Sequence, residues 1–319
     1  NEINHEKLLN QNKNIICRGP DEKQHIEGNL SEFSNRNNLY YSFIFNRLSI
    51  VDLTVNASQP MFSSQFNTSI MFNGEIYNHK SLRHNLEGEN IKFKSKNSDT
   101  EVLLIGLSKY GLSFLENITG QFAITFIDFN KNKLFLIRDR LGQKPLFYSF
   151  KNNNLLFSSN LKSLANMHKD ISIDESSVDE YISYGYITSP KTIFKDMYKV
   201  KPAEIIEFDL DHQMKIKSKK IYWEIKSFVN DSNFQKDIFY EKFNKAVSLR
   251  KEADVEVASL LSGGIDSTSV VKALSETSTS VNTFSIGYED NKYDEKHWSQ
   301  IVSNKYSTNH IEEIITNNE

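Results

Sequence analysis

The chain has 319 residues, of which 38% are hydrophobic and 12% aromatic, a composition that indicates a globular protein long enough for two domains. Its formal net charge of −3 gives no electrostatic reason to expect nucleic acid or an anionic membrane as a partner. The only cysteine, Cys17, excludes an internal disulfide and suits a reducing cytoplasm, and no apolar run approaches the roughly 20 residues of a transmembrane helix.

The first two thirds of the chain are expected to be rich in antiparallel strands. Short aromatic and β-branched runs alternate there with turn-forming residues. Two pairs of these runs are separated by Asn-rich turns and predict β-hairpins. The expected strands cover residues 40–45, 68–72, 121–129, 133–137, 146–150 and 155–159, and the second of them ends at an Asn-Gly pair.

One helix between these strands has clear start and stop signals. Ser98, with Glu101 three residues later, predicts a capping box, and Gly111 stands where a C-terminal cap is expected. A separate helix set among antiparallel hairpins indicates an α+β layered domain. We expect this domain to cover residues 1–212.

The last third changes to an alternation of strands and helices. This order is typical of a doubly wound α/β domain, which we expect over residues 234–319 after a connecting segment at 213–233. The first strand is continuously apolar (VEVASLL), which predicts burial in a parallel sheet. Two or three strands are too few for an independent domain of this type. Helices are expected at 234–250, 266–274 and 294–305, and strands at 255–261, 281–286 and 310–315.

A loop of sequence SGGIDST, residues 262–268, joins the first of these strands to the next helix. Its glycines let the backbone approach a ligand closely, and the N-terminus of the following helix favours an anion. Asp266 would repel phosphate by itself, so it is expected to hold a Mg²⁺ ion that bridges to the phosphate. An ordinary Gly-Gly turn capped by serine and aspartate is the alternative interpretation.

The loop resembles the pyrophosphate loop of the ATP pyrophosphatases, which cleave ATP between its α- and β-phosphates and adenylate a substrate. The segment FSIG at residues 284–287 likewise resembles the second nucleotide-contacting strand of the asparagine synthetases. The resemblance places Leu261 and Ile286 near the adenosine. The residues that it implies for the pyrophosphate are Ser262, Gly263, Gly264, Asp266 and Ser267.

Five polar motifs of the first domain carry a second resemblance. Each motif alone could be a turn, a helix first-turn carboxylate or a surface ion pair. In their order along the chain they resemble the class II glutamine amidotransferase domain of the asparagine synthetases, an N-terminal-nucleophile fold. The motifs are RGPD (18–21), RLSIVD (47–52), NGEIYN (73–78), SDTE (98–101) and RDRLGQKPL (138–146).

This resemblance implies a binding site for free glutamine. Arg47 would bind the α-carboxylate through its guanidinium fork, with main-chain groups of Ile50 and Val51 beside it. The ammonium group of glutamine needs anionic acceptors, and Glu75 and Asp99 would supply them. The domain is therefore expected to recognise both charged ends of a free amino acid.

Hydrolysis of the glutamine amide passes through a tetrahedral oxyanion. By resemblance, the side-chain amide of Asn73 and the backbone N–H of Gly74 form the oxyanion hole, where such donors are worth roughly 3 kcal/mol each. The family's nucleophile is an N-terminal cysteine whose own α-amino group acts as base. This sequence starts at Asn1, so the strand that carries the nucleophile is expected to be missing from it. The C-terminal part of the family's enzyme is expected to be missing as well. Cys17 is internal, and we interpret it as a buried, inert thiol.

The expected function is that of a glutamine-dependent asparagine synthase that uses glutamine, aspartate, ATP and Mg²⁺. A related amidotransferase with a sugar, peptide or other carboxylate acceptor is an alternative, because acceptor selection lies largely outside these residues. A catalytically inactive fragment or a binding protein is an alternative of another class, because the cysteine nucleophile is absent. No nucleic acid or membrane partner is expected, and a homodimer is left open. The chain alone is expected to be poorly soluble, because its incomplete second domain exposes apolar faces.

Overall fold

The computed structural model describes residues 10, 13, 15–32, 39–211, 214–229, 234–288 and 296–315. The chain divides into two compact units, Asn1–Val229 and Asn230–Glu319. The domain boundary that the sequence places between residues 212 and 213 lies outside the described residues. Much of the expected connecting segment is nevertheless structured, because Lys215–Ile221 forms a strand of the first unit.

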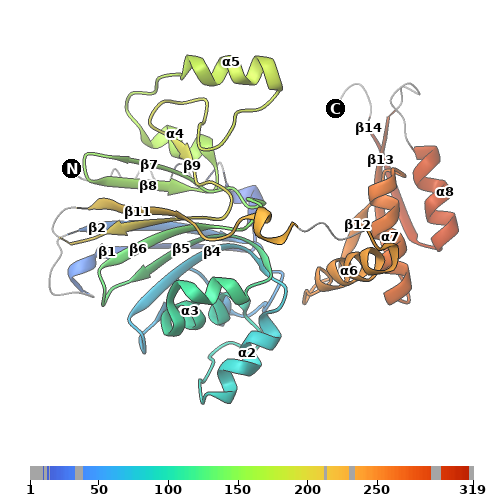
Figure 1. Ribbon diagram of the computed structural model, residues 1–319, viewed down its shortest axis with the longest axis horizontal. Helices are drawn as coiled ribbons and strands as arrows, with labels where there is room; N and C mark the ends of the chain where they lie inside the picture. Colours follow the sequence, from blue (N-terminus) through green and yellow to red (C-terminus); the bar gives the residue numbers. More distant parts are fainter. Residues whose placement is uncertain are drawn as a thin grey trace. The chain divides into compact units, whose positions relative to one another are not determined.

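The first unit is built around a six-stranded antiparallel sheet (Figure 1). Its strands are β3 (Met61–Ser63), β4 (Thr68–Ile76), β5 (Gly120–Asp128), β6 (Lys133–Arg138), β10 (Glu204–Asp209) and β11 (Lys215–Ile221). They lie in the order β11-β10-β6-β5-β4-β3. The longest pairing, between β4 and β5, runs from Thr68 opposite Asp128 to Ile76 opposite Gly120.

The described part of this unit also contains two smaller antiparallel sheets, the α-helices α2 to α5 and short 3₁₀ helices. One sheet pairs β1 (Glu22–Asn29) with β2 (Tyr40–Arg47). The other has the order β8 (Asn154–Ser158), β7 (Phe147–Lys151) and β9 (Tyr198–Lys199). The helices are α2 (His79–Gly88), α3 (Asp99–Tyr110), α4 (Leu161–Met167) and α5 (Glu175–Tyr184).

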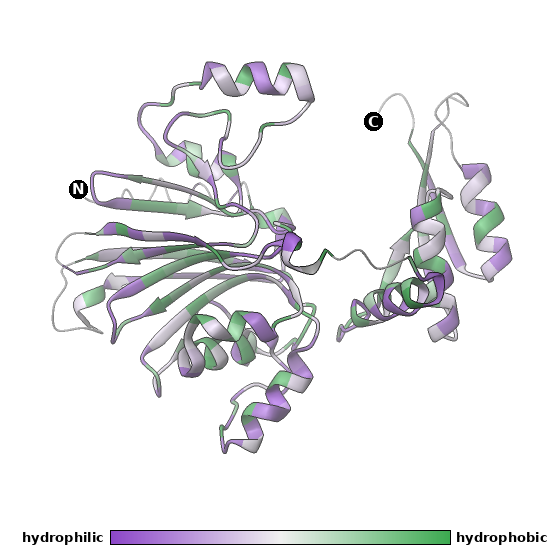
Figure 2. Ribbon diagram, viewed as in Figure 1, coloured by the Kyte–Doolittle hydropathy of each residue, from purple (hydrophilic) through white to green (hydrophobic). Residues whose placement is uncertain are grey.

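The central sheet is buried on both faces. Alternate residues of β5 and β6 enter two apolar clusters, with Ile124 and Ile137 in one and Ile127 and Leu136 in the other. The first cluster includes residues of α2 and α3, and the second includes residues of β7 and β10. Burial on both faces explains why the sequence of β5 is almost continuously apolar. Figure 2 shows these hydrophobic residues along the central strands and hydrophilic ones along α2.

Most predicted elements of the first unit are present. Both expected hairpins are confirmed as β5–β6 and β7–β8. The prediction that the 68–72 strand ends at Asn73-Gly74 is wrong, because β4 continues to Ile76. Its partner β5 runs beside it as far as Gly120, so both residues lie within a paired strand.

Helix α3 begins and ends as predicted, although its capping box is only half formed. Ser98 Oγ accepts the N–H of Glu101 at 3.3 Å, and Gly111 follows the last turn with φ 67°. The carboxylate of Glu101 does not return this bond. It accepts the N–H groups of Lys94 and Ser95 at 2.8 and 2.7 Å, which fastens the preceding loop to the helix.

The second unit has the predicted alternation of strands and helices. A three-stranded parallel sheet has the order β12 (Ala258–Leu260), β13 (Asn282–Tyr288), β14 (Asn309–Ile315). Its helices are α6 (Lys236–Leu249), α7 (Ile265–Thr277) and α8 (Lys296–Tyr306). The start predicted for the last helix, at residue 294, lies outside the described residues. No helix in the described part of the chain is long and apolar enough to span a membrane.

The prediction of a buried first strand in this unit is wrong. β12 has only three residues, and Leu260 is 78% exposed. In the strand register Leu260 lies beside Phe284, which lies beside Ile311, and all three side chains are exposed. One face of the small sheet is therefore apolar and uncovered by the described residues.

Candidate functional site

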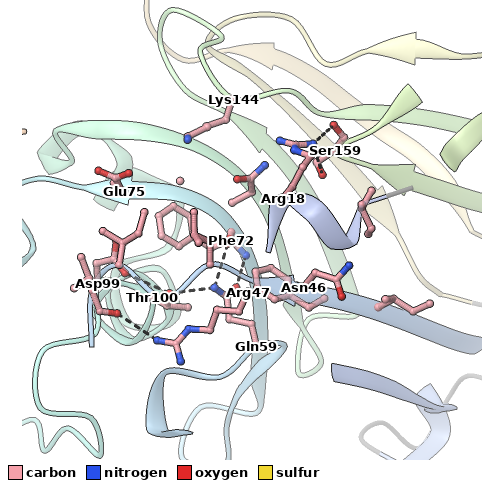
Figure 3. Close-up of a pocket in the computed structure, with 18 residues that line it drawn as sticks. Arg18, Asn46, Arg47, Gln59, Phe72, Glu75, Asp99, Thr100, Lys144 and Ser159 are labelled. Atoms are coloured by element: carbon pink, nitrogen blue, oxygen red, sulfur yellow. Dashed lines mark hydrogen bonds between the residues drawn. The ribbon is translucent and has the colours of Figure 1, made fainter. Parts of the chain in front are cut away.

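A polar cavity of about 250 Å³ lies in the first unit, between β2, β4 and the start of α3 (Figure 3). Its volume corresponds to roughly eight water molecules. The sequence motifs that reach it extend from Arg18 to Lys144, and the fold brings them together. All the residues predicted to bind glutamine or form the oxyanion hole line this cavity: Arg47, Ile50, Val51, Asn73, Gly74, Glu75 and Asp99.

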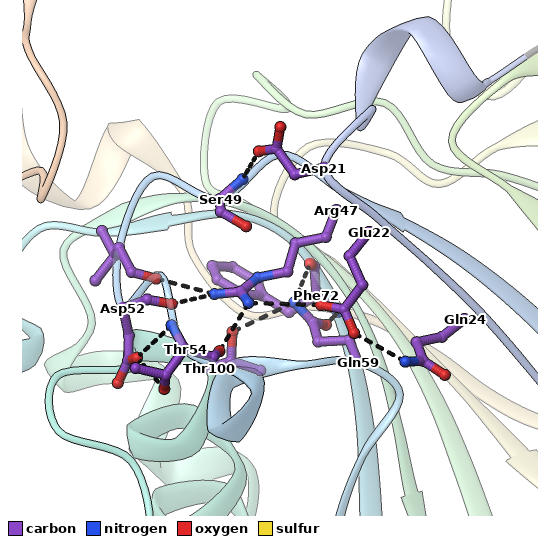
Figure 4. Close-up of polar contacts among 11 residues, drawn as sticks. Asp21, Glu22, Gln24, Arg47, Ser49, Asp52, Thr54, Gln59, Phe72 and Thr100 are labelled. Atoms are coloured by element: carbon purple, nitrogen blue, oxygen red, sulfur yellow. Dashed lines mark hydrogen bonds and ion pairs between the residues drawn. The ribbon is translucent and has the colours of Figure 1, made fainter.

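Arg47, the last residue of β2, is buried and fastens the loop that follows it (Figure 4). Its guanidinium donates to the carbonyl oxygens of Thr54 at 3.0 Å and Val51 at 3.3 Å, and also to that of Asp52. It forms an ion pair with Glu22 at 3.6 Å. Both Nη groups are thus occupied, and only the Nε N–H has no partner within the described residues, so one donor rather than the predicted fork is left for a carboxylate ligand.

Asp52 closes the same loop from the other end. Its carboxylate accepts the hydroxyl of Thr54 at 2.6 Å and the N–H of Asn97 at 2.9 Å. Burial alone would raise the pKa of Asp52, but these hydrogen bonds outweigh it and hold the pKa below its usual value. The charged aspartate thus joins the loop after β2 to the loop before α3, and the polar cavity is lined by residues of the first loop and by the start of α3.

The outer edge of β4 presents a row of backbone groups away from β5. Alternate residues of a strand direct N–H and C=O to the same edge, and here they are Ile70, Phe72, Gly74 and Ile76. Ile70 pairs with β3, the Phe72 N–H donates to Gln59, and the Ile76 N–H donates to Asp99. Among the described residues, the N–H of Gly74 has no partner. It faces the polar cavity.

The position of Gly74 allows no other side chain. A Cβ atom there would lie 2.0 Å from the carbonyl oxygen of Gln121 and 2.8 Å from Cα of Phe122. The glycine therefore permits β4 and β5 to stay close where the strand borders the cavity. Asn73 and Glu75, on either side, have no side-chain hydrogen bond or ion pair to any described residue, so both can serve a ligand.

Asp99 is buried at the first position of α3, 6% exposed. One carboxylate oxygen accepts the N–H of Ile76 at 3.1 Å, and the other lies 3.4 Å from the Thr100 hydroxyl. Burial raises the pKa of Asp99 to about 6, against the lowering effects of the Ile76 hydrogen bond and His79, and the charge of Glu75 adds to the rise. An ammonium group near the Asp99 carboxylate would favour its charged form.

Further polar residues that were not predicted as site residues also line the cavity, among them Gln59, Arg18 and Lys144. Gln59 is buried against β4. Arg18 donates to the carbonyl oxygen and hydroxyl of Ser159, at 3.0 and 3.2 Å. Lys144 stands on the RDRLGQKPL loop and forms no side-chain hydrogen bond or ion pair within the described structure. The motif-based signal for these residues was only that two of them belong to RGPD and RDRLGQKPL.

The loop that carries Lys144 is held from inside by Asp139. This buried carboxylate accepts backbone N–H groups of Leu141, Gln143 and Lys144 at 3.1, 2.9 and 3.0 Å. Arg138 binds the same loop through the carbonyl oxygens of Gly142 and Lys144. The charged residues at the start of this motif are therefore structural, and they fix the loop at the edge of the polar cavity.

Cys17 is exposed, which corrects the interpretation of a buried thiol. It lies in a short 3₁₀ helix, Ile16–Arg18, that has no buried residue. Its neighbour Arg18 reaches the polar cavity, whereas Cys17 does not line it.

A second, apolar cavity of about 190 Å³ lies next to the polar one and shares Ile15 and Ile44 with it. Consecutive residues of β2 and of β8 line it, together with Met71 of β4 and Leu164 of α4. Among the described strands, β2 pairs only with β1 and β8 only with β7. The cavity has no charged lining residue, and most of its lining is apolar.

The predicted phosphate loop lies at the start of α7 in the second unit. Gly263 has φ 81°, and Gly264 immediately precedes the helix, whose first turn contains Asp266. Ser262 Oγ lies 3.2 Å from Ser267 Oγ. The side chain of Leu261 is buried in an apolar cluster, so only its backbone could approach a ligand, whereas Ile286 is 55% exposed.

The described residues contain no group of three or more His, Cys, Asp or Glu that could hold a metal ion. Asp266 is exposed in the first turn of α7, where an anion would also bind. This arrangement fits a Mg²⁺ ion held by one carboxylate and by phosphate oxygens, which is the usual way in which proteins bind Mg²⁺ with nucleotides.

Comparison with protein families gives two matches. Residues 1–223 match the glutamine amidotransferase domain family, and residues 239–319 match the asparagine synthase family. Together the matched segments include the polar cavity and the phosphate loop.

Individual relatives agree with these matches. A Methanocaldococcus jannaschii protein, provisionally named a glutamine-hydrolysing asparagine synthetase, is 33% identical over 97% of this chain and 62% of its own length. Asparagine synthetase (glutamine-hydrolysing) 1 of Bacillus subtilis is 33% identical over 91% of this chain and 44% of its own. Amidase chry2 of Gibberella zeae is 31% identical over 82% of this chain and 37% of its own. The chain thus spans less than two thirds of these relatives.

Among solved structures, glutamine phosphoribosylpyrophosphate amidotransferase from B. subtilis, in complex with ADP and GMP, is similar at 15% identity and a TM-score of 0.45. The similarity covers 96% of this chain and 61% of that protein. At this level it adds nothing to the assignment of residues.

Proposed function

Because this chain belongs to the family of glutamine-hydrolysing asparagine synthetases, we propose that its full-length enzyme makes asparagine from aspartate, glutamine and ATP. The observation that carries this proposal is the polar cavity of the first unit. It combines the partly available guanidinium of Arg47, the unpartnered side chains of Asn73 and Glu75, and the open N–H of Gly74. These groups match the two charged ends and the reacting amide of one glutamine molecule.

In the first unit, Arg47 would hold the α-carboxylate, and Glu75 with Asp99 the ammonium group. The nucleophile, by family resemblance a cysteine thiolate of the full-length enzyme, would attack the side-chain amide carbon. The resulting oxyanion would accept hydrogen bonds from Asn73 and from the Gly74 N–H. Collapse of this intermediate releases ammonia and leaves a thioester, which water hydrolyses to glutamate.

In the second unit, the loop before α7 would bind the leaving pyrophosphate of ATP. Backbone N–H groups at the helix start and the hydroxyls of Ser262 and Ser267 would contact its oxygens. Asp266 would hold the Mg²⁺ ion, which neutralises phosphate charge. The adenylated carboxylate of aspartate is then open to attack by ammonia, with AMP as leaving group.

A related acceptor is the second candidate. The similarity to the Gibberella zeae amidase, 31% identical over 82% of this chain, shows that this sequence resembles proteins other than asparagine synthetases by name. The acceptor in that case would be a sugar, peptide or other carboxylate.

The test is an assay of the full-length enzyme with glutamine, aspartate, ATP and Mg²⁺. We expect asparagine, glutamate, AMP and pyrophosphate in equal amounts. Glutamate release without asparagine would instead favour another acceptor. If glutamine is not hydrolysed at all, the protein is a binding protein rather than an amidotransferase, and the proposal fails.

A further inference from the structure

Successive residues on the outer edge of β4 hydrogen-bond to different kinds of partner. At Ile70 the partner is the backbone of β3, in register with Met61. At Phe72 the partner is a side chain: the Phe72 N–H donates to Gln59 Oε1 at 2.6 Å, and Gln59 Nε2 donates to the Phe72 carbonyl oxygen at 3.1 Å. The carboxamide acts here as a peptide group would, because it offers one acceptor and one donor in the same plane.

Because Gln59 pairs with β4 through its side chain and not through its backbone, the next edge residue of β4 is affected. If a backbone strand continued past Phe72, its next pairing position would be opposite Gly74, and it would cover the Gly74 N–H. A side chain has no next position, so the hydrogen-bond ladder ends at Phe72. The following edge group, the Gly74 N–H, is left facing the polar cavity.

The Gln59 side chain is itself fixed by burial and by a further hydrogen bond. The residue is 6% exposed, and its Nε2 also lies 3.3 Å from Thr100 Oγ1. The Thr100 hydroxyl lies 3.4 Å from a carboxylate oxygen of Asp99. The Gln59 side chain therefore connects β4, which carries the proposed oxyanion-hole residues, to α3, which carries Asp99.

We propose that Gln59 is a positioning residue for amide hydrolysis: it ends the β3 ladder at Phe72 and thereby keeps the Gly74 N–H open and aimed at the oxyanion. The inference rests on the proposed hydrolysis of glutamine in this cavity. Gln59 itself need not touch the reacting amide. Its effect should therefore appear in the transition state, where the Gly74 N–H bonds to the oxyanion, rather than in the binding of glutamine.

The test uses the full-length enzyme and two variants of Gln59. Gln59→Met removes donor and acceptor at nearly constant size, whereas Gln59→Glu keeps the acceptor for the Phe72 N–H and loses only the donor to the Phe72 carbonyl oxygen. We expect Gln59→Met to lower kcat for glutamine hydrolysis by about 100-fold, the scale of losing one oxyanion donor, with KM changed less than about threefold. Gln59→Glu should give a smaller loss of kcat in the same direction.

Two inhibitors separate positioning from general damage. The aldehyde analogue of glutamine, glutamate γ-semialdehyde, adds the nucleophile to its carbonyl carbon and places an oxyanion at the hole, whereas glutamate does not. Binding of the aldehyde should weaken by about 100-fold in Gln59→Met, and binding of glutamate should be unchanged. Ser69→Ala is the matched control, because Ser69 Oγ also bridges β4 to β3, at Met61, and neither residue lines the cavity.

Three results would contradict the inference. The first is a kcat for hydrolysis by Gln59→Met within about threefold of the wild-type value. The second is an equal weakening of aldehyde and glutamate binding, and the third is an equal loss of kcat in Ser69→Ala. A wild-type enzyme that does not hydrolyse glutamine would instead reject the proposed function, and the inference with it. The two failures are distinguished by the wild-type rate alone.

Discussion

At the scale of single residues, two buried aspartates near the polar cavity differ in how their charge is satisfied. For both, burial disfavours the charged form. Hydrogen bonds from Thr54 and Asn97 outweigh this for Asp52 and lower its pKa. For Asp99, burial prevails over the hydrogen bond from Ile76, and the pKa rises to about 6. The charge of Asp52 is thus satisfied by hydrogen bonds from the protein alone, whereas Asp99 is suited to a cationic partner supplied by a ligand.

The raised pKa of Asp99 predicts a stability cost at neutral pH. The folded-state pKa of about 6 exceeds the ordinary aspartate pKa of 3.8, so the contribution of Asp99 is fully favourable below about pH 4 and is lost as the pH rises through 6. Asparagine is neutral at every pH. Asp99→Asn should therefore raise the free energy of unfolding by up to about 3 kcal/mol at pH 8 and leave it nearly unchanged at pH 4, measured by urea unfolding.

Asp52→Asn is the matched control, with the opposite sign. Because the pKa of Asp52 is lowered, its stabilisation is present at neutral pH and is lost as the pH falls through that lowered value. The variant should be less stable than wild type at pH 8, and the difference should shrink in acid. If both variants change stability in the same direction at pH 8, the assignment of these two environments is wrong.

At the scale of elements, the sequence predicted what depends on neighbours along the chain. The Ser98 cap and the Gly111 stop of α3 involve contacts within a few residues, and both are present. The end of β4 depends on β5, about 45 positions later, and was misplaced. The burial of β12 was misjudged because it depends on what covers its sheet.

The same distinction holds for the site. Motif resemblance brought together residues that line one cavity, but it gave no sign of Gln59. The contacts of Gln59 with Phe72 and Thr100 cross 13 and 41 positions of sequence. Only the folded edge of β4 shows that this side chain replaces a strand. The roles of the cavity residues toward glutamine stay predictions.

The close pairing of β4 and β5 predicts a strict requirement for glycine at position 74. Gly74→Ala would place a methyl group 2.0 Å from the Gln121 carbonyl oxygen, so the two strands must separate next to the core residues Phe72 and Phe122. We expect a loss of several kcal/mol of stability, visible as a large drop in melting temperature or as insoluble protein.

Gly88→Ala provides the control for this substitution. Gly88 is the last residue of α2, and a Cβ there would meet no atom within 4 Å. The change should stabilise the chain by up to about 1 kcal/mol, because alanine favours the helix over glycine. Equal stability of the two alanine variants would show that β4 and β5 have more room than the structure indicates.

At the scale of the whole molecule, the two units differ in how well they enclose their apolar residues. The first has large clusters on both faces of its central sheet. The second has two small clusters and leaves Leu260, Ile286 and Ile311 exposed. An uncovered apolar sheet face favours association with other molecules.

This difference predicts that the first unit is the better-behaved part of the chain. A protein ending at Val229 should remain monomeric under conditions in which the 319-residue chain associates, as measured by light scattering and by binding of a hydrophobic dye. Within the longer chain, Ile311→Lys should reduce association, whereas Ile238→Lys on α6 is a control outside the sheet. Equal association of the short and long proteins would contradict this account.

The exposed position of Cys17 gives the chain a built-in labelling point. It is the only thiol in these 319 residues, and it directly precedes Arg18, whose side chain lines the polar cavity. A maleimide fluorophore attached there would lie at the rim without occupying the cavity. Its emission could then follow the arrival of an amino acid in real time, with no turnover required.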